Sequence, residues 1–183
     1  MTPINILCNG DSSGNITVSN VTGTTGIYSY DWSDEHDDPI NQNLSAGNYY
    51  VTITDGNGCS NTFFQVLIQP LSITATLSYS DISVNGAGNG NIFATVSGGN
   101  SPYTFSWSGP NNYSNNNSSI NSLEMGIYTL IVTDASGCSQ TFNQVINEPN
   151  CNVFITETFT APLCHGGMAT VYWQNSGGLA PYS

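Results

Sequence analysis

LSAGNYYVTITDGNGCSNTFFQVLIQP (residues 44–70) returns as LEMGIYTLIVTDASGCSQTFNQVINEP (residues 123–149), an offset of 79 residues. Upstream, GNITVSNVTGTTGIYSYDW matches GNIFATVSGGNSPYTFSW, with Trp32 in the place of Trp107. A similarity at one fixed offset is the sequence signature of tandem structural repeats. The chain is therefore expected to be an array of copies of one small unit.

The repeat predicts three domains, over residues 1–70, 71–149 and 150–183. The first is expected to lack its first strand, the second to be complete, and the third to hold only the N-terminal part of a unit. Both ends of the chain are thus predicted to truncate a repeat.

Each copy has the pattern of short strands. Tyr103, Phe105 and Trp107 alternate with Thr and Ser, which is the period of a half-buried strand. Clusters of Gly, Asn, Pro and Ser between such runs indicate turns, and no segment has a sustained helical period. Six or seven short strands with a Trp on the third predict an immunoglobulin-like sandwich. The predicted fold class is all-β: tandem immunoglobulin-like β-sandwich repeats with a period of about 79 residues.

The second copy is the easiest to divide into strands. In immunoglobulin order, strands A, B, C, E, F and G are expected at 71–79, 91–97, 102–107, near 119–123, 127–133 and 138–147. The Leu-x-x-Gly-x-Tyr pattern before strand F is similar to a tyrosine corner, whose hydroxyl holds the preceding loop. The Asp-x-x-Gly-Cys pattern after strand F predicts a turn in which the Asp accepts backbone N–H groups and the Gly has a positive φ.

PYTFSW (residues 102–107), followed by LxxGxYxLxVTDxxGC, resembles the SprB-type repeat of Bacteroidota gliding-motility adhesins. The resemblance covers two nearly whole copies and the start of a third. It implies very large cell-surface proteins that are exported by the type IX secretion system and contact the substratum or a polysaccharide. The chain departs from the pattern at Ile27, where the family has Pro, and at Val84, which occupies the position of Cys8 and Cys164.

The composition excludes several functions. The chain has no Lys or Arg against 12 Asp and Glu, a formal charge of −12. It therefore lacks the cations that hold phosphate, and we expect no binding of nucleic acid or of anionic membranes. No apolar run reaches the roughly 18 residues that a membrane span needs, so no membrane insertion is expected. The N-terminus lacks the pattern of a signal peptide.

The densest acidic run is DWSDEHDD (residues 31–38), in which Asp34, Asp37 and Asp38 are candidates for binding Ca²⁺. The run lacks EF-hand spacing, and the corresponding loop of the second copy has no acid, so a solvated acidic loop is favoured. His36 and His165 come from different copies and do not have zinc-ligand spacing. We therefore expect no metal, no cofactor and no catalytic site, and interpret the chain as not being an enzyme.

The aromatic residues at recurring strand positions are expected to be core. Tyr172 and Trp173 are adjacent on one strand and so point to opposite faces, which leaves one of them a candidate for the surface. With Tyr113, they are the candidate ligand-facing aromatics.

Five Cys in a secreted β-type chain suggest disulfides. Cys8 precedes strand B and is therefore expected at the end of the first repeat that faces the second repeat. Cys59 lies in the F–G turn, at the opposite end of the first repeat. A strand separates these ends by roughly 17–20 Å, far beyond the limit of about 7 Å on the Cα separation in a disulfide. The favoured pair is therefore Cys8 with Cys138, in the F–G turn of the second repeat, and Cys8–Cys59 is the alternative.

The remaining cysteines, Cys59, Cys151 and Cys164, are expected to have no partner within this chain. By the same logic, Cys59 pairs with a preceding unit and Cys164 with a following one.

The function predicted from these features is a non-catalytic extracellular segment of the stalk or adhesive part of a bacterial cell-surface adhesin. Its expected partners are flanking repeats and a polysaccharide or the substratum. The alternatives are a carbohydrate-binding module array of a secreted polysaccharide-degrading enzyme, discriminated by a flat exposed row of aromatics, and a subunit of an extracellular filament.

Overall fold

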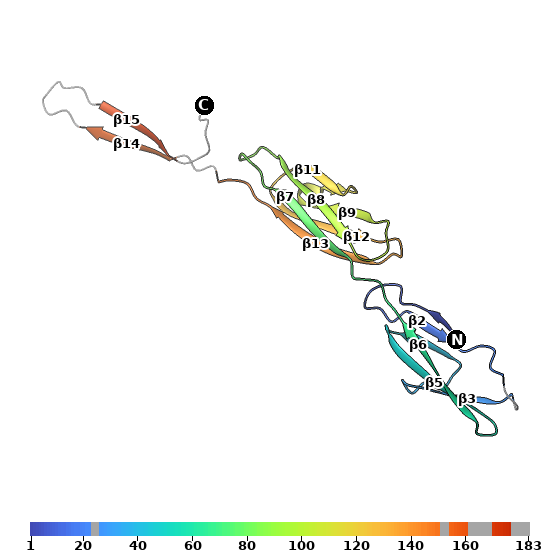
Figure 1. Ribbon diagram of the computed structural model, residues 1–183. Helices are drawn as coiled ribbons and strands as arrows, with labels where there is room; N and C mark the ends of the chain where they lie inside the picture. Colours follow the sequence, from blue (N-terminus) through green and yellow to red (C-terminus); the bar gives the residue numbers. More distant parts are fainter. Residues whose placement is uncertain (23–25, 151–153, 161–169, 177–183) are drawn as a thin grey trace. The chain divides into compact units, whose positions relative to one another are not determined.

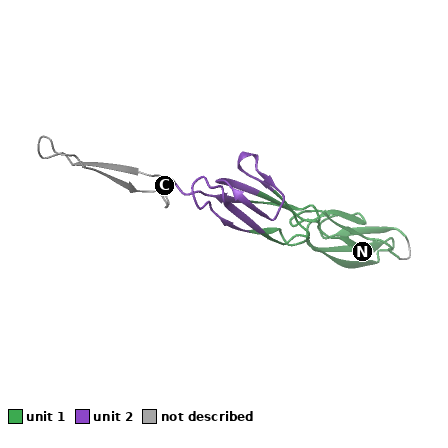
Figure 2. Ribbon diagram, turned by 90° about the horizontal axis from the view of Figure 1, so that it is seen from above, with its two compact units in different colours: residues 1–76, 95–106, 130–142 green, residues 77–94, 107–129, 143–183 purple. Residues whose placement is uncertain are grey.

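The computed structural model describes residues 1–22, 26–150, 154–160 and 170–176, with side chains in the first two ranges. The strands pair in antiparallel sheets, and the described part of the chain has no α-helix (Figure 1). The chain divides into two compact units. One contains residues 1–76, 95–106 and 130–142, and the other residues 77–94, 107–129 and 143–183 (Figure 2).

The first repeat, which lies within the first unit, is a sandwich of two three-stranded sheets. Its sheets have the orders β1-β2-β4 and β3-β5-β6. These correspond to the A-B-E and C-F-G strands of an immunoglobulin-like domain, which confirms the predicted fold class. The strands are β1 (Thr2–Ile4), β2 (Gly14–Thr17), β3 (Tyr28–Trp32), β4 (Ile40–Leu44), β5 (Gly47–Asp55) and β6 (Ser60–Leu67).

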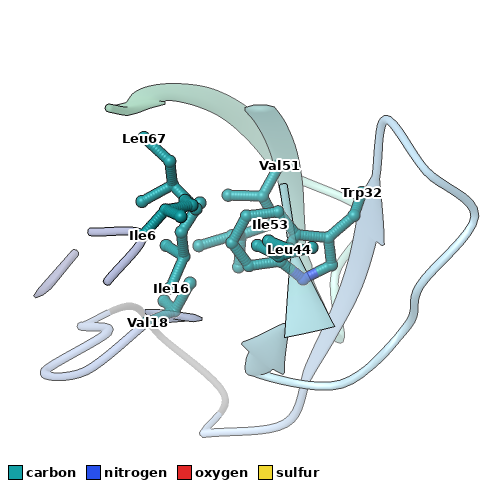
Figure 3. Close-up of a cluster of buried hydrophobic side chains, with 8 residues drawn as sticks. All are labelled: Ile6, Ile16, Val18, Trp32, Leu44, Val51, Ile53 and Leu67. Carbon is teal, nitrogen blue, oxygen red and sulfur yellow. The ribbon is translucent and has the colours of Figure 1, made fainter. Parts of the chain in front are cut away.

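Alternation along these strands builds the core of the first sandwich. Its eight buried side chains point toward one another (Figure 3), and they are Ile6, Ile16, Val18, Trp32, Leu44, Val51, Ile53 and Leu67. Trp32, at 3% exposed, satisfies its indole N–H by donating to the carbonyl of Asp38 at 2.8 Å. A buried indole needs such an acceptor, and the loop after β3 supplies it.

One expectation about the first repeat needs correction. The repeat was expected to lack its first strand, but β1 pairs with β2 over Thr2, Pro3 and Ile4 in the place that β7 holds beside β8. A strand of 3 residues is too short to carry an alternating pattern, so the sequence does not reveal it. Pro3 is tolerated because β1 is the edge strand of its sheet.

The second repeat has the same order of strands in its two sheets, with one additional strand, β10. Its sheets are β7-β8-β11 and β10-β9-β12-β13. The strands are β7 (Thr74–Ser80), β8 (Gly90–Ser97), β9 (Thr104–Ser108), β10 (Ser114–Asn115), β11 (Ser119–Leu123), β12 (Gly126–Thr133) and β13 (Ser139–Ile146). The six strands expected here are all present, with ends shifted by up to three residues.

The added strand β10 follows a short 3-10 helix, Pro110–Asn112. The stretch SGPNNYSNNNSS reads as an open loop in sequence, yet Ser114 and Asn115 pair with Ser108 and Trp107. Trp107, at 1% exposed, donates its indole N–H to the carbonyl of Asn117 at 2.9 Å. This bond matches that of Trp32, and the predicted burial of both Trp residues is confirmed.

Both tyrosine corners are present. The hydroxyl of Tyr49 donates to the carbonyl of Ser45 at 2.9 Å, and that of Tyr128 to the carbonyl of Glu124 at 3.1 Å. Each bond ties strand F to the loop four residues earlier. Burial raises the pKa of both phenols above the ordinary value, so both remain protonated donors at neutral pH.

A bulge recurs beside strand B in both repeats. The register shifts between Gly14 and Asn15 in the first repeat, and between Asn121 and Leu123 in the second. Glycine is required there by close approach: a Cβ on Gly90 would lie 2.8 Å from Cγ2 of Ile146 and 3.1 Å from the carbonyl oxygen of Leu123.

The third repeat contributes β14 (Phe154–Thr160) and β15 (Thr170–Ser176), which pair antiparallel. The expectation that this copy holds only the N-terminal part of a unit depends on residues that lie largely outside the described ranges.

Gly90→Ala is expected to destabilise the protein by about 1–3 kcal/mol, because the added methyl overpacks a filled site. Asn91→Ala, at the exposed neighbouring position, is the control and is expected to change stability by less than about 0.5 kcal/mol. Urea unfolding followed by Trp fluorescence measures both. Equal stability of the two variants would contradict the close packing at Gly90.

Candidate functional site

The most elaborate polar arrangement in the first compact unit lies where the first repeat meets the second. A disulfide joins Cys8 to Cys138, with Cα atoms 5.5 Å apart and a sequence separation of 130. This is the pair that strand directions favoured over Cys8–Cys59. All the elements that position the two cysteines belong to the same compact unit.

Cys138 is presented by a turn that the carboxylate of Asp134 organises. Oδ1 of Asp134 accepts the backbone N–H groups of Ser136 and Cys138, each at 2.9 Å, and Oδ2 accepts that of Asn100 at 2.9 Å. Gly137 has φ 84°, which the turn requires. The turn predicted from Asp-x-x-Gly-Cys is thus confirmed, and the bond from Asn100 ties it to the loop between β8 and β9.

These N–H donors stabilise the charged form of the Asp134 side chain, which is 6% exposed. The hydrogen bond from Asn100 is the largest influence that lowers its pKa, and those from Cys138, Ser136 and Gly137 add to it against the opposing effect of burial. Because the pKa of Asp134 is lower in the folded than in the unfolded protein, its carboxylate stabilises the fold at pH values above the unfolded pKa. That stabilisation is lost as pH falls through the folded pKa.

Cys8 is presented by a loop that is latched to the segment between β6 and β7. The side-chain amide of Asn9 donates to the carbonyl of Pro70 at 2.9 Å. The backbone N–H of Gly10 donates to Oε1 of Gln69 at 2.8 Å. We call this pair of hydrogen bonds the loop latch. It fixes the cysteine loop of one repeat to the segment that leads into the next.

The second repeat has its own loop latch. Asn85 donates to the carbonyl of Pro149 at 3.1 Å, and the N–H of Gly86 donates to Oε2 of Glu148 at 3.1 Å. The loop latch was not predicted from the sequence. Its signal is the recurrence of Asn-Gly, at 9–10 and 85–86, with Gln-Pro or Glu-Pro at the end of the same repeat.

The segment between β6 and β7 is also bonded at both of its ends. Ile68 accepts the N–H of Ile6 at 3.0 Å and donates to Oδ1 of Asn5 at 3.1 Å. Leu71 accepts the N–H of Gly99 at 2.8 Å. The hydrogen bonds at Ile68 come from the first repeat, and the one at Leu71 comes from a residue of the second. The backbone from Ile68 to Leu71 is therefore restrained at both ends.

The acidic candidates are placed in the loop between β3 and β4. Asp34 accepts two hydrogen bonds from the side-chain amide of Asn41, at 2.9 and 3.0 Å. Asn41 is 2% exposed and stands where the second repeat has the buried Ile120, so it needs this acceptor. Asp37 and Asp38 are exposed. Among the described residues, no three His, Cys, Asp or Glu side chains lie close enough together to hold a metal ion.

The three candidate ligand-facing aromatics do not lie together on one strand. Tyr113 is partly buried and meets the edge of Tyr128, with ring centroids 5.4 Å apart and planes at 84°, so it does not form a flat exposed face. Tyr172 and Trp173 lie on β15, and their side chains are outside the described residues, as are Cys151 and Cys164. No described helix is long and apolar enough to cross a membrane.

An aromatic pair that sequence reasoning missed lies on the outer face of the first repeat. Tyr50 and Phe64 are opposite in the β5–β6 register, with ring centroids 5.0 Å apart and 49% and 51% exposed. In the second repeat these positions are Thr129 and Asn143, which share a hydrogen bond of 2.8 Å. The pair is therefore particular to the first repeat.

The family model of the SprB repeat matches the chain at two places, residues 2–36 and 76–112. These matches confirm the resemblance noted in the sequence. Each begins near strand A of one repeat and ends just beyond its buried Trp. Among curated proteins, none matches the chain.

Several solved structures of immunoglobulin domains are similar at low identity. A chain from a study of Dscam isoform specificity is 13% identical with TM-score 0.35, covering 67% of this chain and 38% of that one. The amphioxus IgVJ-C2 molecule is 14% identical with TM-score 0.37, covering 74% and 97%. A complex of Dpr11 with DIP-gamma is 14% identical with TM-score 0.36, covering 82% and 100%.

Loss of the disulfide is expected to lower the free energy of unfolding by about 2–4 kcal/mol, because the cross-link restricts the unfolded chain. Cys8→Ser and Cys138→Ser should lose the same amount, and Cys59→Ser, at an exposed free thiol, should lose almost nothing. Urea unfolding without reductant measures the three variants. A loss in Cys59→Ser equal to that in Cys8→Ser would contradict the assignment.

The stabilising effect of the Asp134 carboxylate is expected to disappear in acid. Because the unfolded pKa is about 3.9, the stability difference between wild type and Asp134→Asn should be largest near neutral pH. It should shrink as pH falls below that value. Urea unfolding at a series of pH values tests this, with Asp37→Asn as the control at an exposed loop acid. A difference that is constant with pH would show that charge at Asp134 is not involved.

Proposed function

We propose that this chain is a non-catalytic part of the stalk or adhesive region of a very large bacterial cell-surface adhesin, which acts in gliding motility or surface attachment. Two matches to the SprB repeat and two consecutive sandwiches support this proposal. The observation that carries it is the junction, where a disulfide joins consecutive repeats.

The junction suits a protein that bears load. A force applied along the chain passes from the first repeat to the second by two covalent routes, the peptide backbone through Pro70 and the disulfide. The loop latch and the bonds of Ile68 and Leu71 oppose rotation of that backbone. A linker with such restraints transmits force instead of absorbing it by bending.

The surface chemistry suits an extracellular location. With no Lys or Arg in its 183 residues, the chain has no cleavage site for trypsin-like proteases. Its formal charge of −12 repels polyanions. A disulfide is stable outside the cytoplasm.

The direct test is made on the bacterium that produces the protein. Antibodies raised against this chain are expected to label intact cells, and a strain that lacks the repeats should attach to glass less well or glide less than its parent. Labelling only after permeabilisation, or unchanged attachment and gliding, would refute the proposal.

A carbohydrate-binding module is the second candidate, and the exposed pair Tyr50–Phe64 favours it. Stacked or tilted aromatic faces on a flat sheet are suited to sugar rings. A glycan array with the wild type, Tyr50→Ala and Phe64→Ala would separate the two functions. A spacer binds no glycan, whereas a module binds one and loses it in both variants but not in Thr52→Ala, on the same face.

A further inference from the structure

Cys59 lies in the same kind of turn in the first repeat as Cys138 in the second. In both turns the carboxylate of the leading aspartate, Asp55 or Asp134, accepts the backbone N–H groups two and four residues further on, at 2.9–3.0 Å. The glycine before each cysteine has a positive φ, 83° in the first turn and 84° in the second. The two turns therefore present their cysteines in the same way.

The surroundings of the two cysteines differ. Cys138 is bonded to Cys8, and the segment from Leu71 to Ile73 lines the groove beside it, with Ile73 buried at 7% exposed. Cys59 is a free, exposed thiol. It adjoins a hollow of about 540 Å³, with apolar walls that include Val18, Val21, Tyr28, Ile53 and Phe63. In the second repeat the segment at 71–73 and the Cys8 loop line the groove beside the turn, whereas in the first repeat the corresponding turn adjoins the hollow.

We propose that the hollow beside Cys59 is a docking site for the end of another repeat of this kind, and that Cys59 forms a disulfide with the cysteine that this repeat carries at the position of Cys8. The occupant is defined by what fills the equivalent place in the second repeat. It is a segment like residues 71–73, in which Ile73 is buried and Leu71 is exposed, followed by strand A, together with a latched Cys-Asn-Gly loop. The proposal rests on the proposed role of the chain in a tandem array.

The loop latch explains why the end of a repeat, with its Cys-Asn-Gly loop, would dock beside Cys59. Asn9 and Gly10 hold the Cys8 loop to Gln69 and Pro70, all within the first repeat. The latch therefore keeps the loop cysteine beside the segment whose isoleucine is buried in the next repeat. The second repeat has the same latch with Val84 at the cysteine position, so its loop lacks the thiol for such a link.

The chemistry requires an oxidant, which is a small disulfide such as oxidised glutathione. The Cys59 thiolate attacks it, forms a mixed disulfide and releases one glutathione thiolate. The thiolate of the loop cysteine then attacks the Cys59 sulfur and releases the second. Two thiols lose two protons and two electrons, and the oxidised glutathione is reduced to two thiols.

The test uses the full chain, extended at its N-terminus by a second copy of residues 1–76 that carries Cys59→Ser. Gly90 matches Gly14 at an offset of 76 residues, so this extension continues into residue 1 in the register of the natural junction. In a glutathione redox buffer, alkylation of the original Cys59 by iodoacetamide is expected to fall at least about tenfold relative to the unextended chain. Peptide mapping should find two linkages, from the added Cys8 to Cys59 and from the original Cys8 to Cys138.

The matched control carries Cys8→Val in the added copy, which reproduces the residue at position 84. Its Cys59 should remain as reactive as in the unextended chain. The Cys8–Cys138 linkage in the same digest reports that the original repeats are folded. Equal reactivity of Cys59 in the extended chain and this control would overturn the proposal, as would Cys59–Cys59 dimers as the main product.

A second measurement does not depend on folding of the added copy. The 183-residue chain is incubated in the redox buffer with a peptide of residues 5–12, NILCNGDS, or with a scrambled peptide. Because this peptide lacks the latch partners Gln69 and Pro70 and the segment at 71–73, the two peptides are expected to give equal yields of mixed disulfide at Cys59. Several-fold more product with the native order would show that the loop alone directs the pairing, and would contradict docking through the latched segment. Neither result depends on surface labelling or attachment of cells, so failure here and failure of the proposed function are distinguishable.

Discussion

The segment from Ile68 to Leu71 is hydrogen-bonded along its length, and the junction depends on this restraint. Ile68 is bonded to Asn5 and Ile6, Pro70 to Asn9, and Leu71 to Gly99. The Cys8 loop is latched to this segment, and the disulfide joins the loop to the turn of the second repeat. Hydrogen bonds therefore organise both sides of the contact that the disulfide closes.

The same scaffold is built twice with different surfaces. The buried Trp, the tyrosine corner, the bulge beside strand B and the Asp-organised turn recur because each satisfies a buried polar group or a close approach of backbone. Outward positions are free of that constraint, and there Tyr50 and Phe64 become Thr129 and Asn143. The two repeats therefore differ on their outer sheet faces while sharing one scaffold.

Much of the fold could be predicted because burial imposes a period of two. The strands of the second repeat, the burial of Trp32 and Trp107, and the turn before Cys138 all follow from local patterns. Strands β1 and β10 could not be predicted, because three or two residues carry no period. The latch between Asn9 and Pro70 joins residues 61 positions apart, so only the fold shows it.

Reoxidation of the reduced chain under native conditions tests the account of the junction most directly. After reduction without denaturant and reoxidation in a glutathione buffer, the linkages are mapped by cleavage at Asp and Glu, since the chain has no Lys or Arg. We expect Cys8–Cys138 as the dominant linkage, with Cys59 free to react with alkylating agents. A dominant Cys8–Cys59 linkage would contradict it, because that pair requires a different path for the first repeat.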